Sequence, residues 1–439
     1  MTNRLNVRRN VIASVAVFAV NLVLMFFTYR LLAVQGGVAI IGLWSSLMAW
    51  VFLIRLGDVG MTNGIIRFAA ACNPEKEPDR IRGYVDTGLA LNAVLFALLA
   101  FAGWAAMRSS LTQVLPDGDR TAATVRPLLP LLFTVFYLQN LSGLVIGALQ
   151  AIHHGYIGSL VLLTGTLTQL VLALLLIPSW GLAGLATAQA SQYALMLVLG
   201  WQLYRCFLAR ASGRAVPLLP RLASWSTAIE VMGFSLKAQL ANFVNGLFEP
   251  LAKLLIGHLA GLNILGLFEV AYRVVVLPRN ALVAGVTAAL PAKTRLLASN
   301  PDAFRELYQK SMTMVGLAST LVLGAVALVS PFIMPIWLGH EEPLLSAFVA
   351  ILALGFWINA VSAPAYTLGM SSGAMGPNIE SSFIALVTLA LLVLLASQSS
   401  QEWLMVLSVS IAVGTSSAWI LWRAKRPWRA DDTAVWITR

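Results

Sequence analysis

Residues 230–279 have the sequence EVMGFSLKAQLANFVNGLFEPLAKLLIGHLAGLNILGLFEVAYRVVVLPR. This stretch contains two apolar segments, each long enough to cross the hydrocarbon core of a bilayer, which takes about 20 residues of helix. Charged side chains interrupt both segments. A charge near the bilayer centre costs about 2.5 to 3.5 kcal/mol on insertion scales, so such residues normally face a water-filled cavity or one another. The stretch therefore predicts a membrane protein with a polar interior.

The composition of the whole chain indicates the same class. Of the 439 residues, 59% are hydrophobic and 11% are charged, and the mean hydropathy is +0.82, which is far above the range of soluble globular proteins. Twelve apolar runs can be placed, so we expect an all-α polytopic membrane protein. The expected spans lie near residues 11–33, 38–57, 84–107, 127–149, 156–177, 182–204, 229–257, 262–290, 311–336, 344–370, 378–396 and 403–422.

Lysine and arginine residues predict the orientation, because cytoplasmic loops of membrane proteins carry an excess of them. With the N-terminus inside, twenty of the 29 basic residues fall in cytoplasmic segments, six fall within spans, and three (Arg108, Arg120 and Arg126) fall outside. Both termini are therefore predicted to be cytoplasmic, and the first span to be an uncleaved anchor. The net charge of +11 is interpreted as a topology signal, with no nucleic-acid partner.

The two halves of the chain resemble each other at a shift of about 222 residues. The glycine-containing segment from Gly37 to Trp44 then matches the segment from Gly261 to Phe268, and GALQAIHHG at 147–155 matches GMSSGAMG at 369–376. Each half has six spans, so both enter the membrane with the same orientation, and a substrate site is expected between them near the midplane. The predicted parts are lobes at 1–207 and 229–424, a cytoplasmic linker at 208–228 and a cytoplasmic tail at 425–439.

Polar side chains share one face of each span in residues 230–279. Glu249 precedes Lys253, and Glu269 precedes Arg273, by four residues, the order that favours contact on a helix. Arg279 has no acidic partner nearby in the sequence. We therefore predict a cavity with net positive charge and no deeply buried acid in the first lobe. The substrate-binding candidates are Lys237, Arg273, Arg279, Glu249, Lys253, Glu269, Arg30 and Asn245.

Some of these residue types have a simpler interpretation. Arg30, Arg55 and Lys253 lie close enough to span ends to reach the headgroups with long side chains. Pro250 and Pro278 are candidate hinges, because proline removes a backbone hydrogen bond and kinks a helix, although a kink without function is the alternative. No cysteine or histidine spacing resembles a metal site, and we expect no catalytic residue and no cofactor.

Two motifs give the chain a resemblance to a known family. They are LGDVGMTNGIIR at residues 56–67, at the end of the second span, and PSWGLAG at residues 178–184, before the sixth. With twelve spans in two halves, the chain resembles the polysaccharide and O-antigen flippases of the multidrug/oligosaccharidyl-lipid/polysaccharide exporter (MOP) superfamily. The resemblance implies two six-helix lobes in a V around a cavity that opens alternately to each side.

The resemblance also implies a cargo and partners. The cargo is a glycan linked to undecaprenyl diphosphate, moved from the cytoplasmic to the periplasmic leaflet of a bacterial inner membrane. A positive cavity suits a diphosphate, which arginine binds through paired hydrogen bonds and lysine binds as a point charge. Membrane lipid and other polysaccharide-biosynthesis proteins are the implied partners, and a monomer is expected. Coupling to protons or sodium stays open.

Asp58, with Arg55 and Arg67 close in sequence, is interpreted as a gate ion pair, or alternatively as a solvated helix cap. The main alternative function is that of the multidrug and toxin extrusion (MATE) branch of the superfamily, whose cationic cargo needs an acidic cavity. A membrane glycosyltransferase or glycan polymerase is a further alternative. The short outside loops argue against it, because they carry no paired carboxylates for acid/base chemistry or metal binding.

Overall fold

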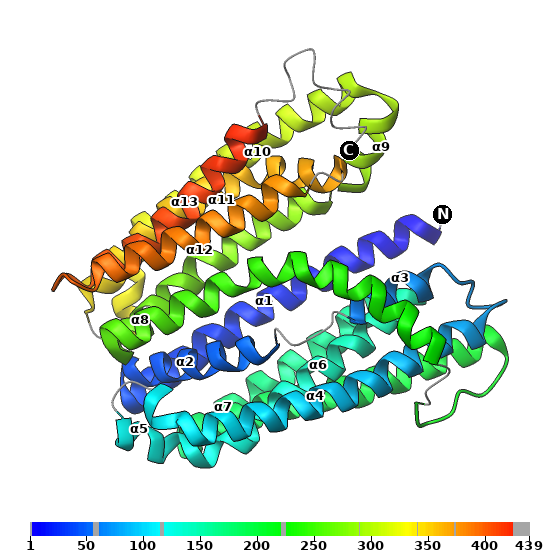
Figure 1. Cartoon of the computed structure of the whole chain (residues 1–439), viewed down its shortest axis with the longest axis horizontal. Coiled ribbons are helices and arrows are strands. Elements are labelled where there is room, and N and C mark those ends of the chain that lie inside the picture. The colour runs from blue at the N-terminus through cyan, green and yellow to red at the C-terminus, as the bar shows by residue number, and fades with distance from the viewer. Residues whose placement is uncertain are drawn as a thin grey trace. The chain divides into compact units, whose positions relative to one another are not determined.

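The structure is a computed structural model of the chain. It describes residues 2–55, 61–114, 118–220, 225–288, 290–339, 341–372 and 375–424, and the statements below refer to these residues. This part of the chain is helical apart from short connections (Figure 1). The first seven elements are α1 (Thr2–Gly36), α2 (Val38–Arg55), α3 (Met61–Ala70), α4 (Pro78–Val114), α5 (Gly118–Val125), the short 3-10 helix η1 (Arg126–Leu128) and α6 (Leu129–Ala151). The others are α7 (Gly155–Ser212), α8 (Trp225–Ala288), α9 (Leu290–Ser299), α10 (Pro301–Leu338), α11 (Pro343–Ser372), α12 (Gly376–Ala396) and α13 (Trp403–Ala424).

Ten of the described helices are long and apolar enough to cross a membrane, and two of these, α7 and α8, are long enough to cross it twice. Each of the two is broken at one glycine with positive φ, at Gly181 (φ 54°, ψ −128°) in α7 and at Gly261 (φ 86°, ψ 173°) in α8. Such torsions are accessible to glycine and strained for other residues. Counting both halves of α7 and α8 gives twelve segments. The expected all-α fold with twelve membrane helices is therefore confirmed.

Contacts between Cα atoms divide the chain into two compact units. Unit 1 comprises residues 1–37 and 50–243, and unit 2 comprises residues 38–49 and 244–439, so α2 contributes to both. Each unit is described by itself below. The predicted lobe boundaries and linker stay a prediction.

The helices of the two halves follow the predicted repeat. The helices α4 and α10 begin at Pro78 and Pro301, and α7 and α12 begin at Gly155 and Gly376. Both pairs are offset by close to the predicted 222 residues. Gly37 and Gly261, which the repeat places in register, both have positive φ. The repeat is therefore visible in helix starts and helix breaks, not only in sequence.

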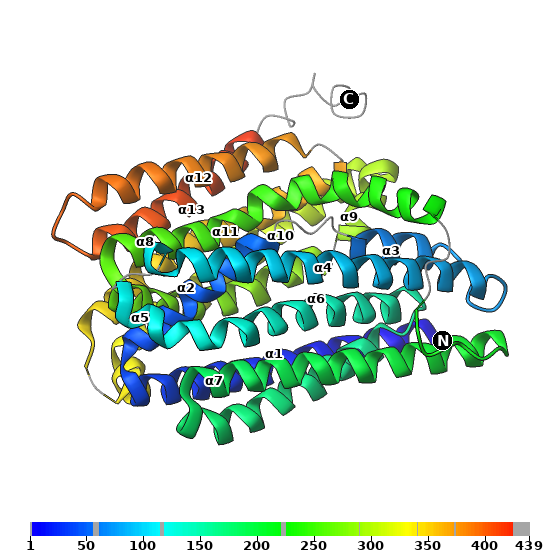
Figure 2. The same cartoon turned by 60° about the horizontal axis from the view of Figure 1, so that its bottom comes forward.

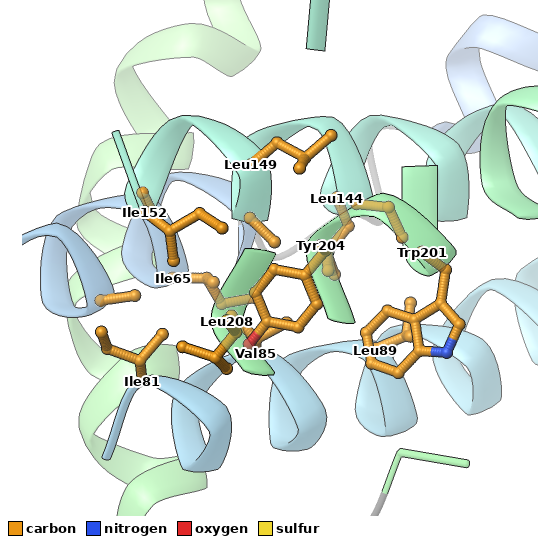
Figure 3. Packing of buried hydrophobic residues seen from close by; sticks show 14 of the residues in the cluster. Ile65, Ile81, Val85, Leu89, Leu144, Leu149, Ile152, Trp201, Tyr204 and Leu208 are labelled. Carbon is orange, nitrogen blue, oxygen red and sulfur yellow. The ribbon is translucent and has the colours of Figure 1, made fainter. Parts of the chain in front are cut away.

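The core of unit 1 lies where α3, α4, α6 and α7 meet, and Figures 1 and 2 show α6 and α7 running alongside each other. Figure 3 shows Tyr204 of α7 among Ile65 of α3, Val85 of α4 and Leu144 of α6. Tyr204, Ile65 and Val85 are fully buried. Lipid tails are as apolar as these side chains, so close van der Waals packing, rather than escape from water, favours this contact.

In unit 2, α11 packs against α10 and α13, and α12 packs against α13. The first part of α2 packs against α8 through two glycines, Gly42 and Gly266, which the repeat places in register. A Cβ atom on Gly42 would lie 1.9 Å from the carbonyl oxygen of Leu262, and one on Gly266 would lie 2.1 Å from that of Val38. Only glycine allows the two backbones to approach this closely.

The ends of α10 show how the local sequence sets a helix boundary. The side chain of Asn300 accepts a hydrogen bond from the backbone N–H of Ala303 (3.1 Å), and Pro301 occupies the first turn. Asparagine is a favoured cap, and proline fits the first turn because its missing N–H would have no helical partner there. Gly339 ends the helix with φ 85°, the usual role of glycine after a C-terminus.

Candidate substrate-binding site

Two ion pairs form within the segments of α8 on either side of Gly261. Lys253 Nζ lies 2.6 Å from Glu249 Oε1, and Arg273 Nε lies 2.8 Å from Glu269 Oε1. Both pairs join residues four positions apart on one helix. The acid-before-base pairing predicted from the sequence is confirmed.

The same four residues also pair across the break at Gly261. Lys253 Nζ lies 2.8 Å from Glu269 Oε2, and Arg273 Nη2 lies 3.3 Å from Glu249 Oε1. Each cation thus contacts both carboxylates, and each carboxylate contacts both cations. We call these four residues the charge quartet. Its two negative and two positive charges cancel, so it adds no net charge to the site.

Neutral donors complete the hydrogen bonding of both carboxylates. The Ser45 hydroxyl donates to Glu269 Oε2 (2.8 Å), and the Tyr272 hydroxyl donates to Glu249 Oε2 (3.4 Å). The Tyr272 ring also lies 5.7 Å from Lys253 Nζ, within cation–π range. The Phe356 ring packs edge-on against Tyr272 at 5.5 Å between centroids. Residues of α2 and α11 therefore hold the quartet from outside α8.

Burial differs across the quartet. Lys253 is 4% exposed and Glu269 is 3% exposed, whereas the side chains of Glu249 and Arg273 are each 36% exposed. A buried Lys253 with two carboxylate partners does not reach the headgroups, so that alternative is wrong for this residue. The quartet has a buried edge, Lys253 with Glu269, and an accessible edge, Glu249 with Arg273.

Arg279 lies further along α8 and has a different environment. Its Nη1 donates to Asn280 Oδ1 (3.0 Å), and its Nη2 donates to Asn359 Oδ1 of α11. Asn359 in turn donates to Ser417 Oγ of α13 (2.9 Å). Among the described residues Arg279 makes no ion pair with a carboxylate, and its buried Nε has no hydrogen-bond acceptor. Arg279 is thus a cation oriented by neutral amides and not neutralised by an acid.

The other predicted site residues belong to unit 1 or fall outside the described part of the chain. Arg30 is half-buried in α1 of unit 1, and Arg55 and Arg67 are exposed at the ends of α2 and α3. The side chains of Lys237 and Asn245, and all of Asp58, lie outside the part of the chain that the structure describes. The gate ion pair therefore stays a prediction.

The two candidate hinge prolines lie inside α8. Pro250 is buried and Pro278 is half-buried, and the non-helical torsions in α8 occur at Gly261 and not at either proline. The two prolines flank the quartet along the chain, with Pro250 directly after Glu249. A hinge motion at either proline stays a prediction.

Sequence reasoning missed two buried charges. Asp86 of α4 is 3% exposed and accepts from Arg82 Nε at 3.0 Å, so the expectation that the first lobe holds no deeply buried acid is wrong. The spacing of Arg82 and Asp86 was the available signal. Lys293, expected in a cytoplasmic loop, is fully buried in α9 and donates to Thr367 Oγ1 (3.1 Å). Burial lowers the pKa of Lys293.

Residues 166–342 match a protein family described as "Polysaccharide biosynthesis protein". No curated protein matches the sequence. Among solved structures, the chain is similar to a multidrug resistance MATE family transporter of the MOP superfamily in an inward-facing conformation. The TM-score is 0.74 at 14% identity, over 91% of this chain and 94% of that one.

A second similar structure is a MOP superfamily transporter from Pyrococcus furiosus whose binding pocket is described as having reverse polarity, suggesting a different function. Its TM-score is 0.67 at 14% identity, over 96% of this chain and 95% of that one. A third similar structure is a multidrug resistance MATE family transporter of the MOP superfamily in an outward-facing conformation. Its TM-score is 0.66 at 14% identity, over 96% of this chain and 95% of that one. The chain therefore has the helical fold of the MOP superfamily transporters, and residues 166–342 match the family described as polysaccharide biosynthesis protein.

Proposed function

We propose that the protein is a flippase that moves an undecaprenyl-diphosphate-linked oligosaccharide or polysaccharide repeat unit across a bacterial inner membrane. It carries the anionic head from the cytoplasmic to the periplasmic leaflet by alternating access. The match of residues 166–342 to a family described as polysaccharide biosynthesis protein supports this class of cargo, and the transporter fold supports movement across the membrane. Transport, rather than bond formation, is the proposed activity.

The observation that carries the proposal is the charge left at Arg279. In the charge quartet, the carboxylates of Glu249 and Glu269 are matched by Lys253 and Arg273. Arg279 has only amide partners among the described residues, and its buried Nε–H has no acceptor. A buried donor without an acceptor is costly, and a phosphate oxygen bonded to a guanidinium is among the stronger hydrogen bonds in proteins. An anion would supply the acceptor that this donor lacks among the described residues.

The accessible edge of the quartet supplies a second binding position. Arg273 lies six residues from Arg279, about 9 Å along a helix at 1.5 Å per residue. Its Nη2 contact with Glu249 is the longest of the four ion pairs, at 3.3 Å, and is half-exposed. A diphosphate can replace Glu249 at this nitrogen while Arg273 Nε keeps Glu269 and Lys253 keeps both acids. The quartet then exchanges one partner without leaving a buried charge alone.

The multidrug alternative needs a carboxylate that is free to take a cation. Glu249 and Glu269 each contact two cations, and Asp86 is paired with Arg82. A MATE-like fold does not by itself decide the cargo, since the Pyrococcus furiosus neighbour is described as having a pocket of reverse polarity. The pairing of these acids supports an anionic cargo over a cationic one.

The test compares cargoes of opposite charge in the same vesicles. Purified protein is reconstituted into proteoliposomes that contain either a lipid-linked oligosaccharide or a cationic dye. Head-group crossing is followed by accessibility to an impermeant glycosidase, and dye movement is followed by fluorescence. We expect glycan crossing at least tenfold above empty liposomes and no dye transport. Dye transport that is lost in Glu249→Gln, with no glycan crossing, would refute the proposal.

A further inference from the structure

Unit 1 carries an apolar groove between α4 and α6 that the proposed function does not use. Its volume is about 360 Å³, within the range of small-molecule sites. The Thr134 hydroxyl in its lining donates to the Pro130 carbonyl oxygen (2.9 Å) and so needs no acceptor from a ligand. Aromatic rings and small side chains form most of the wall, including Ala97, Ala100, Trp104, Phe133 and Tyr137.

Two arginines are each four residues, about one helical turn, from a residue that lines this groove. Arg108 follows Trp104 by four residues on α4, and its guanidinium carbon lies 5.3 Å from the centre of the Trp104 ring. Arg126, in η1, precedes Pro130 by four residues. Both side chains are exposed, and neither makes an ion pair with a described residue.

These arginines are unusual for their side of the membrane. In the predicted orientation α4 runs outward and α6 runs inward, so both arginines are expected on the outer side of the groove, one helical turn from the lining residues Trp104 and Pro130. Only three of the 29 basic residues are predicted to lie outside, and Arg108 and Arg126 are two of them. Topology signals are cytoplasmic, so they do not account for these two cations.

From this juxtaposition we propose that the groove is an outer-leaflet site for a single-chain polyprenyl diphosphate. The hydrocarbon chain lies along the aromatic wall, and the diphosphate lies between Arg108 and Arg126. A groove of about 360 Å³ holds the part of one chain next to the headgroup, and two guanidinium groups match the multiple charge of a diphosphate better than the single charge of a phospholipid. The inference rests on the proposed function, since it places the carrier lipid where a flipped product would emerge.

Binding, not transport, tests this proposal, so that its failure is separable from failure of the flippase assignment. Undecaprenyl diphosphate without glycan is titrated onto the purified protein and bound lipid is counted by native mass spectrometry. Undecaprenol and phosphatidylglycerol are the comparison lipids. The titration is repeated on Arg279→Gln protein, which lacks the diphosphate site proposed in unit 2. We expect this variant still to bind one lipid, in the groove of unit 1.

Two sets of variants locate that remaining lipid. We expect Arg108→Gln with Arg126→Gln, and separately Ala100→Phe, to weaken its binding at least tenfold. Ala102→Phe is the matched control, because Ala102 lies on α4, is exposed and does not line the groove. Unchanged affinity in the arginine double variant, or equal affinity for phosphatidylglycerol, would overturn the proposal. The arginine variants keep the test decisive if Ala100→Phe does not fold, because both arginine side chains are exposed.

Discussion

Within the charge quartet, replacing Lys253 should lower the free energy of unfolding most. Lys253→Met would leave Glu269, 3% exposed, with Arg273 and Ser45 as its remaining partners. Breaking a buried pair costs about 3 to 5 kcal/mol when the other charge is left alone. Because Arg273 still compensates Glu269, we expect a loss of about 2 to 3 kcal/mol. Thermal unfolding of the purified wild type and of the Lys253→Met variant in detergent measures this loss of stability.

Two further variants control this measurement. Lys310→Met removes an exposed lysine of α10 and should change stability by less than about 0.5 kcal/mol. Lys253→Met with Glu269→Gln removes one charge of each sign and should recover part of the loss. If the double variant is less stable than Lys253→Met alone, the quartet is not held together by charge pairing.

His154, in the connection between α6 and α7, should make the stability of the folded protein depend on pH. Its ring stacks on Phe207 at 4.1 Å between centroids, and burial, with a smaller effect of neighbouring His153, lowers its pKa below the ordinary value of 6.5. The unfolded chain therefore binds the proton more readily than the folded chain does. The contribution of His154 to stability is present above pH 6.5 and is lost as the pH falls through the lowered pKa.

The variant His154→Phe keeps an aromatic ring that can stack on Phe207 and removes the titratable imidazole. We expect the melting temperature of the wild type to fall relative to that of the variant between pH 7 and pH 5, with similar values at pH 8. Melting curves of both proteins across this range provide the measurement. Parallel pH profiles would mean that His154 is protonated as easily in the folded as in the unfolded protein.

At the scale of elements, the contact of α2 with α8 depends on Gly266. A Cβ there would lie 2.1 Å from the Val38 carbonyl oxygen, so Gly266→Ala must push two backbones apart. Overpacking of this kind costs about 1 to 3 kcal/mol. Gly316→Ala in α10 is the matched control, since its Cβ would meet nothing within 4 Å. Alanine there should be neutral or stabilising by up to about 1 kcal/mol.

Thermal unfolding of the two alanine variants compares them directly. We expect a lower melting temperature for Gly266→Ala than for Gly316→Ala. Because Ser45 lies on the same part of α2 and donates to Glu269, Gly266→Ala should also disturb the charge quartet. Equal melting temperatures would show that α2 and α8 separate at no cost.

The elements also show which part of the site is predictable from sequence. The pairs of Glu249 with Lys253 and of Glu269 with Arg273 follow from four-residue spacing on a helix, and both are present. The cross pairs depend on the break at Gly261, which returns the chain antiparallel so that residues equally far from the glycine meet. Helical periodicity alone does not give that register. The contacts from Ser45 and Phe356 need tertiary structure altogether.

At the scale of the whole molecule, the native cysteines report the orientation. Cys206 is exposed near the end of α7, whereas Cys72 is 6% exposed. With both termini cytoplasmic, an impermeant maleimide should label Cys206 in inverted membrane vesicles and not in intact spheroplasts. Cys206→Ser should remove the signal. Labelling in spheroplasts and not in inverted vesicles would reverse the predicted topology.

Long apolar runs made the twelve membrane segments predictable, because each must satisfy its own backbone hydrogen bonds inside lipid. The short helices α3, α5 and α9 have no such requirement and were not expected. The burial of Asp86 and Lys293 was missed for a related reason. Asp86 lies at the start of the expected span 84–107 and Lys293 lies just beyond the expected span 262–290, but neighbouring helices cover both side chains. Burial by neighbouring helices is a property of the assembled unit, not of the local sequence.

The central claim is that Arg279 binds the anionic head of a lipid-linked glycan. Its direct test is the rate of glycan crossing in proteoliposomes for the wild type, Arg279→Gln and Arg279→Lys at equal reconstituted protein. Arg279→Lys keeps the positive charge and loses the paired hydrogen bonds of the guanidinium. We predict at least a tenfold fall for Arg279→Gln and an intermediate rate for Arg279→Lys. Crossing at the wild-type rate by well-folded Arg279→Gln protein would contradict the claim.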